Sequence, residues 1–368
     1  MTMKIFRNII TITLAIINII AVLAMVVCSY SIYLSPTKYP NWSYLGMMLP
    51  ACIAATLLFA LLWLIFKWKY TIISILGIAA CWNSIRDYCP INPFQHEPTG
   101  RTLKILSYNV LSFGGTNLNE DNTQVVEYIA QSGADIVCLQ EVSTLNRNYV
   151  RKRLDEVYPY IMINDEHKPQ DAILSRYPIL SSRTIKYPTP TASSCVYELL
   201  VDADTMTVIN NHLESYQLDA ADKLMYKQMI KNSAMINEPA ADEQIIDMKE
   251  SFWWLEGKLA KANSRRAQQA DLLADEIEQL LTHTQYIIVC GDFNDSPVSY
   301  VHHTLTKHLN DAYTLSGNGP GWSYNQSAMY FRIDHILVSN QFTPYQAKVD
   351  KTVQESDHYP IFCTLEIH

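Results

Sequence analysis

The sequence predicts an α/β domain preceded by an N-terminal transmembrane helical region. Long uncharged apolar segments at residues 9–33 and 44–66 predict the membrane helices. From Leu103 onward, strand-like apolar runs alternate with helix-like segments, which is the pattern of the α/β class. Several of these runs end in carboxylate, amide or imidazole side chains, which are costly to bury unpaired inside a sheet. We therefore expect residues 1–88 to form a membrane region and a later domain to carry a functional site.

The first two apolar segments each reach the length of about 20 residues that a helix needs to cross a bilayer. A cleaved signal peptide is not expected, because its apolar core spans only about 7–15 residues. Residues 25–28 also lack the small side chains of a cleavage site. A pair of buried core helices is the less favoured alternative. Both segments are therefore interpreted as membrane spans.

A third, shorter apolar segment at 69–85 is bracketed by aromatic residues, as at a membrane interface. Lys4 and Arg7 before the first span, and Lys67 and Lys69 after the second, are expected on the cytoplasmic side. Three spans then place the following domain outside the cytoplasm, periplasmic if the membrane is a bacterial inner membrane. Two spans would leave it inside. The three-span arrangement is favoured.

The charge of the chain argues against bulk attraction to polyanions. After residue 100, 22 Lys and Arg residues stand against 34 Asp and Glu residues, a balance of −12. Non-specific nucleic-acid binding depends on an excess of cationic side chains. The composition therefore disfavours a general nuclease, although a locally basic cleft or a bound cation would change that. The eight cysteines show no metal-binding spacing, and Cys138, Cys290 and Cys363 are expected to be buried in strands.

Residues 89–100 contain three prolines and a glycine and are expected to be a linker to a domain at 101–368. Strands are expected at 103–110, 135–139, 172–179, 206–209, 286–292, 331–338 and 359–367. A helix is expected at 122–131, with Asp121 or Asn122 as its cap. A helical insertion is expected at about 218–281, broken near Asn237-Glu238-Pro239.

Polar residues follow or open six of the predicted strands: Asn109, Glu141, His212, Asp292 with Asn294, Asp334, and Asp357 with His358. Antiparallel neighbours bring the end of one strand beside the start of the next, so these residues could meet at one sheet edge. Carboxylate and amide oxygens suit Mg²⁺, and imidazoles can transfer protons or contact phosphate. The set therefore predicts attack of an activated water on phosphorus.

The chain from Leu103 onward resembles the endonuclease/exonuclease/phosphatase superfamily, which has the DNase I-like fold. The resemblance rests on motifs in family order: Ser-Tyr-Asn (107–109), Leu-Gln-Glu (139–141), Ile-Leu-Ser-Arg-Tyr-Pro (173–178), Asn-x-His-Leu (210–213), Gly-Asp-Phe-Asn (291–294), Arg-Ile-Asp-His (332–335) and Ser-Asp-His (356–358). It implies a four-layer α/β sandwich of two mixed sheets flanked by helices.

The resemblance also implies a role for each site residue. Glu141 would be the main ligand of Mg²⁺, with Mn²⁺ as an alternative, and Asn109 and Asp357 would lie close to the metal. The remaining catalytic residues would be Asp292 and Asn294 at the nucleophilic water, His358 oriented by Asp334, and His212. The phosphate would be bound by Asn210, His212, Asn294 and His358. Whether Asp292 or His358 removes the proton stays open.

The expected function is membrane-anchored, Mg²⁺-dependent hydrolysis of a phosphodiester, with a phospholipid or small diester favoured as substrate. A nuclease acting on DNA or RNA is the alternative enzyme, and a catalytically inactive phosphate- or protein-binding scaffold is the alternative class. The lipid bilayer is the expected partner, and no protein partner is identifiable. Residues 252–255, Phe-Trp-Trp-Leu, are expected either to pack the insertion onto the domain or to contact the bilayer or an acyl chain beside the site.

Overall fold

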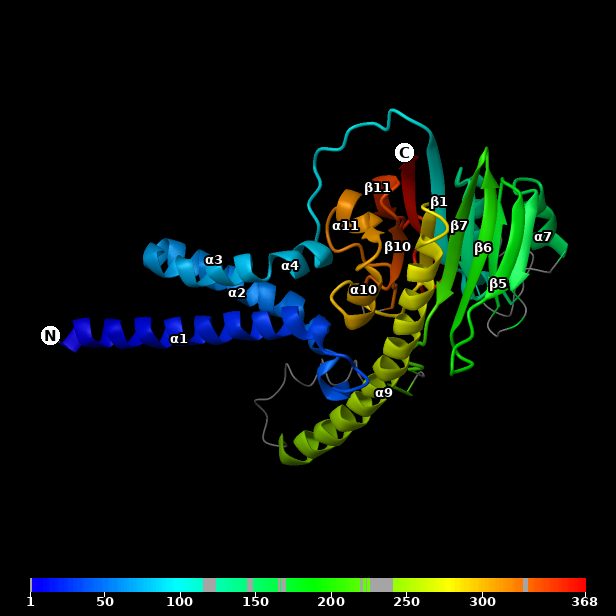
Figure 1. Cartoon of the computed structure of the whole chain (residues 1–368). Helices are drawn as coiled ribbons and strands as arrows, with labels where there is room; N and C mark the ends of the chain where they lie inside the picture. The colour runs from blue at the N-terminus through cyan, green and yellow to red at the C-terminus, as the bar shows by residue number, and fades with distance from the viewer. Residues whose placement is uncertain are drawn as a thin grey trace.

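The structure, a computed structural model, describes residues 2–114, 124–143, 148–164, 166, 170–218, 221–222, 224–225, 241–326 and 330–368. A group of N-terminal helices projects to one side of two packed β-sheets (Figure 1). The expected helix caps Asp121 and Asn122, and the expected break at Asn237-Glu238-Pro239, lie outside the described residues.

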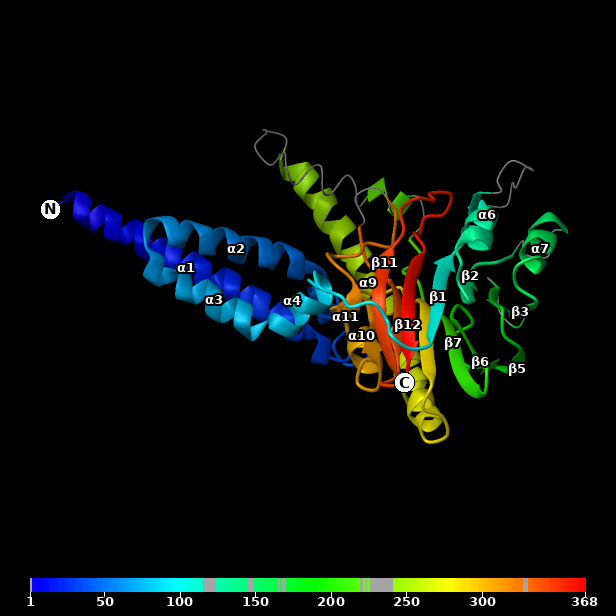
Figure 2. The same cartoon turned by 90° about the horizontal axis from the view of Figure 1, so that it is seen from above.

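Four helices make up the N-terminal group: α1 (Thr2–Tyr30), α2 (Leu49–Phe66), α3 (Thr71–Ala80) and α4 (Trp82–Tyr88). The first three pack against one another, and their long axes run roughly side by side (Figure 2). The predicted third segment is divided into α3 and α4, which meet at Cys81. The connection between α1 and α2 lies at the end of the bundle that faces the sheets (Figure 1).

Two segments of this group, Ile5–Tyr33 and Pro40–Phe66, are long and apolar enough to be candidate membrane spans. Only 22% and 17% of the most apolar 18-residue stretch of each segment are buried, whereas the core helix of a soluble protein would be mostly buried. Polar side chains instead lie between the helices, where Ser74 Oγ donates to Asn18 Oδ1 at 3.2 Å and Ser29 Oγ to Ser84 Oγ at 2.7 Å. Apolar side chains outside and hydrogen-bonded polar ones inside are typical of helices packed in lipid.

The remaining chain forms two six-stranded sheets. The first has the strand order β11-β12-β1-β2-β4-β3. Its strands are β1 (Thr102–Asn109), β2 (Ile136–Gln140), β3 (Tyr160–Asn164), β4 (Asp171–Ser175), β11 (Phe342–Val349) and β12 (Ile361–Ile367). The second has the order β5-β6-β7-β8-β10-β9. Its strands are β5 (Ile179–Thr184), β6 (Ser193–Val201), β7 (Asp204–His212), β8 (Ile287–Asp292), β9 (Asn310–Asp311) and β10 (Asp334–Val338).

Each sheet has one parallel pair near its centre, and the two pairs are arranged alike. In the first sheet β1 runs parallel to β2, and in the second β7 runs parallel to β8. The antiparallel neighbour β12 lies beside β1, and β10 lies beside β8. The carboxyl ends of the parallel strands therefore meet the amino ends of their antiparallel neighbours at the same end of each sheet.

Apolar side chains between the sheets form the central core, which includes four thiols: Cys138, Cys195, Cys290 and Cys363. The expectation that Cys138, Cys290 and Cys363 are buried in strands is confirmed. A second apolar cluster joins the first sheet to α6 (Gln124–Gln131) and α7 (Asn148–Asp155). A third joins the second sheet to α9 (Ala241–Leu281) and α10 (Tyr300–Leu305). Helices thus cover the outer face of each sheet, which gives four layers.

Helix α9 is continuous over 41 residues and crosses the outside of the second sheet (Figure 1). Its carboxyl-terminal half packs on the sheet through apolar side chains spaced three or four residues apart, the spacing of one helix face: Ala270, Leu273, Ala274 and Ile277. Nearer its amino end, Leu255 is buried, whereas Trp253 and Trp254 are 63% and 47% exposed. The two tryptophans therefore do not pack into the domain core.

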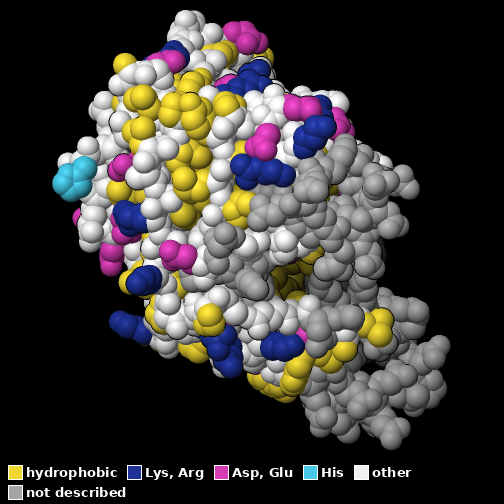
Figure 3. Space-filling view, turned by 90° about the vertical axis from the view of Figure 1, so that its right-hand side faces the viewer, with side chains coloured by type: hydrophobic (Ala, Val, Ile, Leu, Met, Phe, Trp, Pro, Cys, Tyr) yellow, Lys and Arg dark blue, Asp and Glu magenta, His cyan; other side chains and the backbone are white. Residues whose placement is uncertain are grey.

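The face of the domain directed away from the N-terminal helices carries both signs of charge. Basic and acidic side chains are interspersed there (Figure 3). Over the part of this face that the structure describes, no continuous basic area is visible.

Candidate active site

The predicted site residues come from both sheets and meet at one end of the sandwich. Asn109 ends β1 and Glu141 follows β2, while His212 ends β7 and Asp292 ends β8. The remaining residues belong to the antiparallel neighbours: Asp334 opens β10, and Asp357 and His358 precede β12. The expectation of a single sheet edge was therefore too simple. Two sheets each contribute half of the site, because each has its parallel pair ending at the same place.

Asn109 links the two halves of the site. Its Nδ2 donates to Glu141 Oε1 and to Asp292 Oδ2, both at 3.1 Å, while its Oδ1 accepts from the Leu111 backbone at 3.2 Å. In this orientation the amide presents its NH₂ group to the carboxylates, whereas a metal ligand would present oxygen. The expected position of Asn109 beside the metal ligands fits the structure, but this orientation argues against direct ligation.

Two site residues adopt backbone conformations that are uncommon without glycine. Glu141 has φ 59° and Asn294 has φ 53°, both in the left-handed region. Gly291 has φ 137°, and a Cβ there would lie 2.0 Å from the backbone oxygen of Asn211. Glycine is therefore required where β8 approaches β7, one residue before Asp292. Such strain is often found at functional sites.

His358 is buried between two carboxylates. Its Nδ1 lies 2.8 Å from Asp334 Oδ2, and its Nε2 lies 3.6 Å from Asp292 Oδ2. Burial alone would lower the pKa of His358, but the charges of Asp334 and Asp292 outweigh burial and raise that pKa to about 10. Asp334, expected to orient this histidine, is in hydrogen-bonding contact with it.

His212 shares one of these carboxylates, Asp292, and also lies near Glu141. Its Nε2 is 3.7 Å from Glu141 Oε1 and 3.8 Å from Asp292 Oδ2. Burial lowers the pKa of His212, but the neighbouring charges of Asp292, Asp171 and Glu141 raise it above its ordinary value. Asp171, which the sequence did not single out, is fully buried nearby, and burial raises its own pKa to about 6.

Asn294 lies beside Asp292, as expected. Its backbone N–H donates to Asp292 Oδ1 at 2.8 Å, and its Nδ2 donates to the Leu213 carbonyl at 3.0 Å. The buried guanidinium of Arg266, from α9, donates to the Asn294 carbonyl. These contacts fix the turn that follows β8, so that the Asn294 side chain lines the same pocket as Asp292.

Asn210 does not lie where a phosphate-binding residue should. It is fully buried beneath the site, accepts from Gln140 Nε2 at 2.7 Å, and donates to the carbonyls of Leu139 and Ala172 at 3.0 and 3.1 Å. Its amide is committed to bonds between the two sheets, and it does not line the pocket. The expectation that Asn210 binds phosphate is therefore corrected to a structural role.

The pocket at this end of the sandwich is lined by polar and by apolar side chains, which we call its polar half and its apolar half. The polar half contains the expected residues Glu141, His212, Asp292, Asn294, Asp357 and His358. The apolar half contains residues that the sequence did not reveal: Met47, Leu218, Leu255, Leu259, Phe331 and Ile333. Tyr324 packs edge-on against the His358 ring at 5.2 Å. The sequence indicated Leu255 and Ile333 only as members of longer segments, and no sequence signal identified the other four, which come from separate loops and from α9.

The comparisons with known proteins agree with this geometry. A family model described as the endonuclease/exonuclease/phosphatase family matches residues 106–358. The chain belongs to this family. A second model, described as a domain of unknown function (DUF8431), matches residues 8–88. No curated protein sequence matches the chain.

Solved structures of other proteins share the fold. Truncated TDP2 from Caenorhabditis elegans has 15% sequence identity and a TM-score of 0.52, covering 72% of this chain and 97% of its own. The human nocturnin catalytic domain with bound sulfate has 15% identity and a TM-score of 0.52, covering 74% and 97%. A humanized D. rerio TDP2 has 18% identity and a TM-score of 0.51, covering 72% and 99%. The expected DNase I-like α/β fold is thus confirmed.

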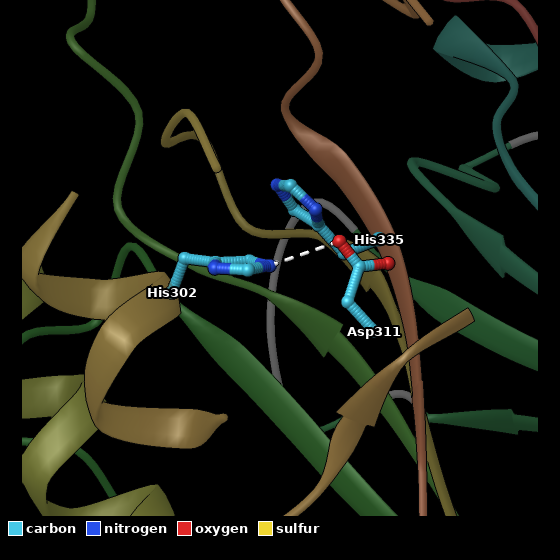
Figure 4. Close-up of side chains that lie close together, drawn as sticks. All are labelled: His302, Asp311 and His335. Carbon is cyan, nitrogen blue, oxygen red and sulfur yellow. Dashed lines mark hydrogen bonds and ion pairs between the residues drawn. The ribbon is translucent and has the colours of Figure 1, made fainter. Parts of the chain in front are cut away.

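A second buried cluster contains none of the pocket-lining residues, although His335 Nε2 lies 3.0 Å from the carbonyl of Asp295, which lines the pocket. Side-chain ligand atoms of His302, Asp311 and His335 lie within 4.8 Å of one another (Figure 4). Asp311 accepts from His302 Nε2 at 3.1 Å, from the Tyr313 backbone at 2.8 Å and from Thr314 Oγ1 at 2.9 Å.

The carboxylate of Asp311 is thus already hydrogen-bonded three times. The Arg332 guanidinium also lies 3.8 Å from it and supplies a compensating charge. These contacts hold the pKa of Asp311 well below its usual range, although burial acts in the opposite direction. We therefore interpret the cluster as a charge-compensated structural network.

This network makes stability depend on pH through His335. Burial, with the positive charges nearby, lowers the pKa of His335 from 6.5 to about 3. Between these pH values the unfolded chain binds a proton that the folded chain does not, so stability falls as pH falls from 6.5 to 3. Between pH 7 and pH 5 this residue should lower the free energy of unfolding by about 2 kcal/mol.

Replacement of His335 by Asn should remove that part of the pH dependence. The free energy of unfolding, measured by chemical denaturation of the detergent-solubilised protein, should be lower at pH 5 than at pH 7. This fall should be about 2 kcal/mol smaller in His335→Asn than in the wild type. His283→Asn, at an exposed histidine, is the matched control and should match the wild type. Equal pH dependence of the unfolding free energy in His335→Asn and the wild type would contradict the interpretation that His335 is buried in its neutral form.

Proposed function

We propose that this chain is a membrane-anchored, divalent-cation-dependent phosphoester hydrolase. The observation that carries the proposal is the convergence of Glu141, Asp292 and His358 in one pocket, where Asn109 bridges the two carboxylates. The reaction forms a bond from a water oxygen to phosphorus and breaks one ester P–O bond. The water proton passes to a base, and the leaving oxygen takes up a proton.

The donor set of the pocket fits a hard cation. Glu141 and Asp357 line the pocket, and the carboxylate of Glu141 is partly exposed to it. Asp334 and Asp292 add two further carboxylates, whose Oδ2 atoms lie 2.8 and 3.6 Å from the ring nitrogens of His358. So many carboxylates in one place repel one another unless a cation offsets them. Glu141 and Asp357 would hold Mg²⁺, with Mn²⁺ as an alternative. When bound, the cation supplies polarisation of a phosphoryl oxygen.

The geometry favours different roles for Asp292 and His358. Both ring nitrogens of His358 face carboxylates, which suits a doubly protonated ring that donates and cannot accept. His358, oriented by Asp334, would therefore contact the phosphate. Asp292, whose backbone is fixed by Gly291, would orient the water and accept its proton.

His212 and Asn294 complete the set of catalytic residues. His212 Nε2 and His358 Nε2 lie 3.8 and 3.6 Å from Asp292 Oδ2, and His212 would donate to the phosphate or to the leaving oxygen. Asn294, held beside Asp292 by its backbone N–H, would bind the phosphate from the turn that follows β8. Preorganised donors of this kind stabilise charge that develops during the reaction.

The pocket favours a substrate with a single phosphodiester over a nucleic acid. Among the described residues that line it, none is lysine or arginine. A nucleic acid or a multiply phosphorylated ligand needs such cations for its further phosphates. The excess of acidic residues after position 100 points the same way. A phospholipid or small diester is therefore favoured, and a nuclease is the second candidate.

We further propose that residues 1–88 are the membrane region, 89–100 the linker and 101–368 the catalytic domain, with three membrane crossings. Helix α1 runs toward the sheets, α2 runs away, and α3 with α4 returns (Figure 1). Lys67 and Lys69 lie between α2 and α3, at the end of the bundle far from the domain. The excess of positive charge at that end supports a cytoplasmic location for it, so that the catalytic domain is extracytoplasmic, in a bacterial inner membrane.

Two substitutions test the chemistry. Glu141→Gln and His358→Asn should each lower Mg²⁺-dependent hydrolysis of bis(4-nitrophenyl) phosphate by about 100-fold or more, because they remove a cation ligand and a phosphate contact. The matched controls Glu198→Gln and His283→Asn change exposed residues and should keep wild-type rates. Chelation of divalent ions should abolish the wild-type activity. Full activity in either site variant would refute the assignment.

The membrane arrangement is tested by a topology reporter. An enzyme that becomes active only outside the cytoplasm, fused after Gly100, should be active if three helices cross the bilayer. The same reporter fused after Lys69 should be silent, since that position would be cytoplasmic. A silent Gly100 fusion would instead support two crossings and a cytoplasmic domain.

A further inference from the structure

The proposed hydrolysis uses only the polar half of the pocket. The apolar half, formed by Met47, Leu218, Leu255, Leu259, Phe331 and Ile333, touches the same space but offers no group for the reaction. A water-filled apolar wall beside a charged site is unfavourable unless a ligand covers it. The pocket is therefore shaped for a ligand that is charged at one end and apolar at the other.

Part of this wall is built by the N-terminal segment rather than by the sandwich. Met47 lies in the turn Leu45–Met48, immediately before α2, and Leu255 and Leu259 lie four residues apart on one face of α9. Gly46 approaches the domain so closely that a Cβ would lie 2.0 Å from the Val298 backbone oxygen. The segment that joins helices α1 and α2 thus completes the pocket.

Hydrogen bonds hold this segment against α9. Tyr44 Oη donates to Glu256 Oε1 at 3.1 Å, next to Leu255 in the sequence. Asn263 Nδ2, one turn beyond Leu259, donates to Ser43 Oγ at 2.8 Å. Glu256 and Asn263 are 9% and 3% exposed. The wall is therefore held at Glu256, between the two leucines in the sequence, and at Asn263, one turn beyond them.

The apolar wall begins close to the first residue of α2, a candidate membrane helix. Met47 precedes the first residue of α2 by only two positions, about 3 Å of helix rise. Exposed aromatic side chains surround this region: Tyr33, Tyr39 and Trp42 on the connection, and Trp253 and Trp254 on α9. Aromatic residues are enriched at membrane–water interfaces. A lipid chain could pass from the bilayer into the pocket along this side.

The two tyrosines that line the pocket, Tyr216 and Tyr324, are poorly placed to hold nucleobases. The Arg266 guanidinium covers a face of the Tyr216 ring at 4.3 Å, and Tyr324 is engaged with His358. Stacking platforms for single-stranded nucleic acid need open aromatic faces together with cations. The aliphatic side chains of Met47, Leu255 and Leu259 are better suited to an alkyl chain.

We propose that Met47, Leu255 and Leu259 form a subsite for the alkyl or acyl chain of a membrane amphiphile whose phosphoester lies at the catalytic carboxylates. This inference rests on the proposed phosphoester hydrolysis and names its substrate class. The connection between α1 and α2 then serves two functions: it links two membrane helices, and it forms the entrance through which the chain leaves the bilayer.

Binding of two phosphonates that differ only in chain length tests the subsite. Titration calorimetry on the full-length protein in nanodiscs with Mg²⁺, corrected with empty nanodiscs, should give decylphosphonate a Kd about 30-fold or more below that of ethylphosphonate, since each buried methylene adds to binding. Leu255→Asn and Met47→Asn should each reduce this ratio to about fivefold or less. Leu272→Asn, at an exposed leucine on α9 outside the pocket, should leave the ratio unchanged.

The same preparation separates this inference from the proposed function. Equal Kd values for the two phosphonates, with hydrolysis of bis(4-nitrophenyl) phosphate retained, would overturn the subsite and leave the hydrolase assignment standing. Chain-length-dependent binding without any Mg²⁺-dependent hydrolysis would support the subsite and contradict the hydrolase. A thymidine dinucleotide that binds more tightly than decylphosphonate would assign the apolar half to nucleobases and overturn the proposal.

Discussion

The site depends on how the two sheets are held together directly beneath it. The amide of Asn210, on β7, accepts from Gln140 Nε2 and donates to the carbonyls of Leu139 and Ala172 in the other sheet. A buried polar group is stabilising only when its hydrogen bonds are made, so this amide fixes one relative position of the sheets. Glu141 follows Gln140 by one residue, and His212 follows Asn210 by two. The position of the two sheets therefore sets the distance between these side chains.

One motif serves both the site and its support, because side chains alternate along a strand. In Arg332-Ile333-Asp334-His335, Asp334 contacts His358 in the site, while His335 turns away into the buried cluster with His302 and Asp311. Arg332 lies over the Tyr313 ring at 4.5 Å and donates to the Asp87 carbonyl at the end of α4. The strand that orients the catalytic histidine is thus also connected to the last N-terminal helix.

The sequence was sufficient for the strands whose ends carry chemistry, because an apolar run followed by Asn, Glu, His or Asp is a clear local pattern. It was insufficient for edge strands such as β11, which contains Pro344 and is interrupted between Tyr345 and Lys348. Asn210 was misassigned because its spacing from His212 places it on the same strand face, and sequence cannot tell the buried end of that face from the open end. Met47 could not be predicted at all, since its place in the pocket depends on how the N-terminal segment packs against α9.

The central claim is that residues far apart in the sequence form a single cation and phosphate site. An experimental structure of the full chain with Mn²⁺ and phosphate, with the metal located by its anomalous scattering, tests it most directly. The account predicts a metal peak in contact with the Glu141 carboxylate and a phosphate between it and His358. A metal found instead at His302, Asp311 and His335, with none at Glu141, would contradict it.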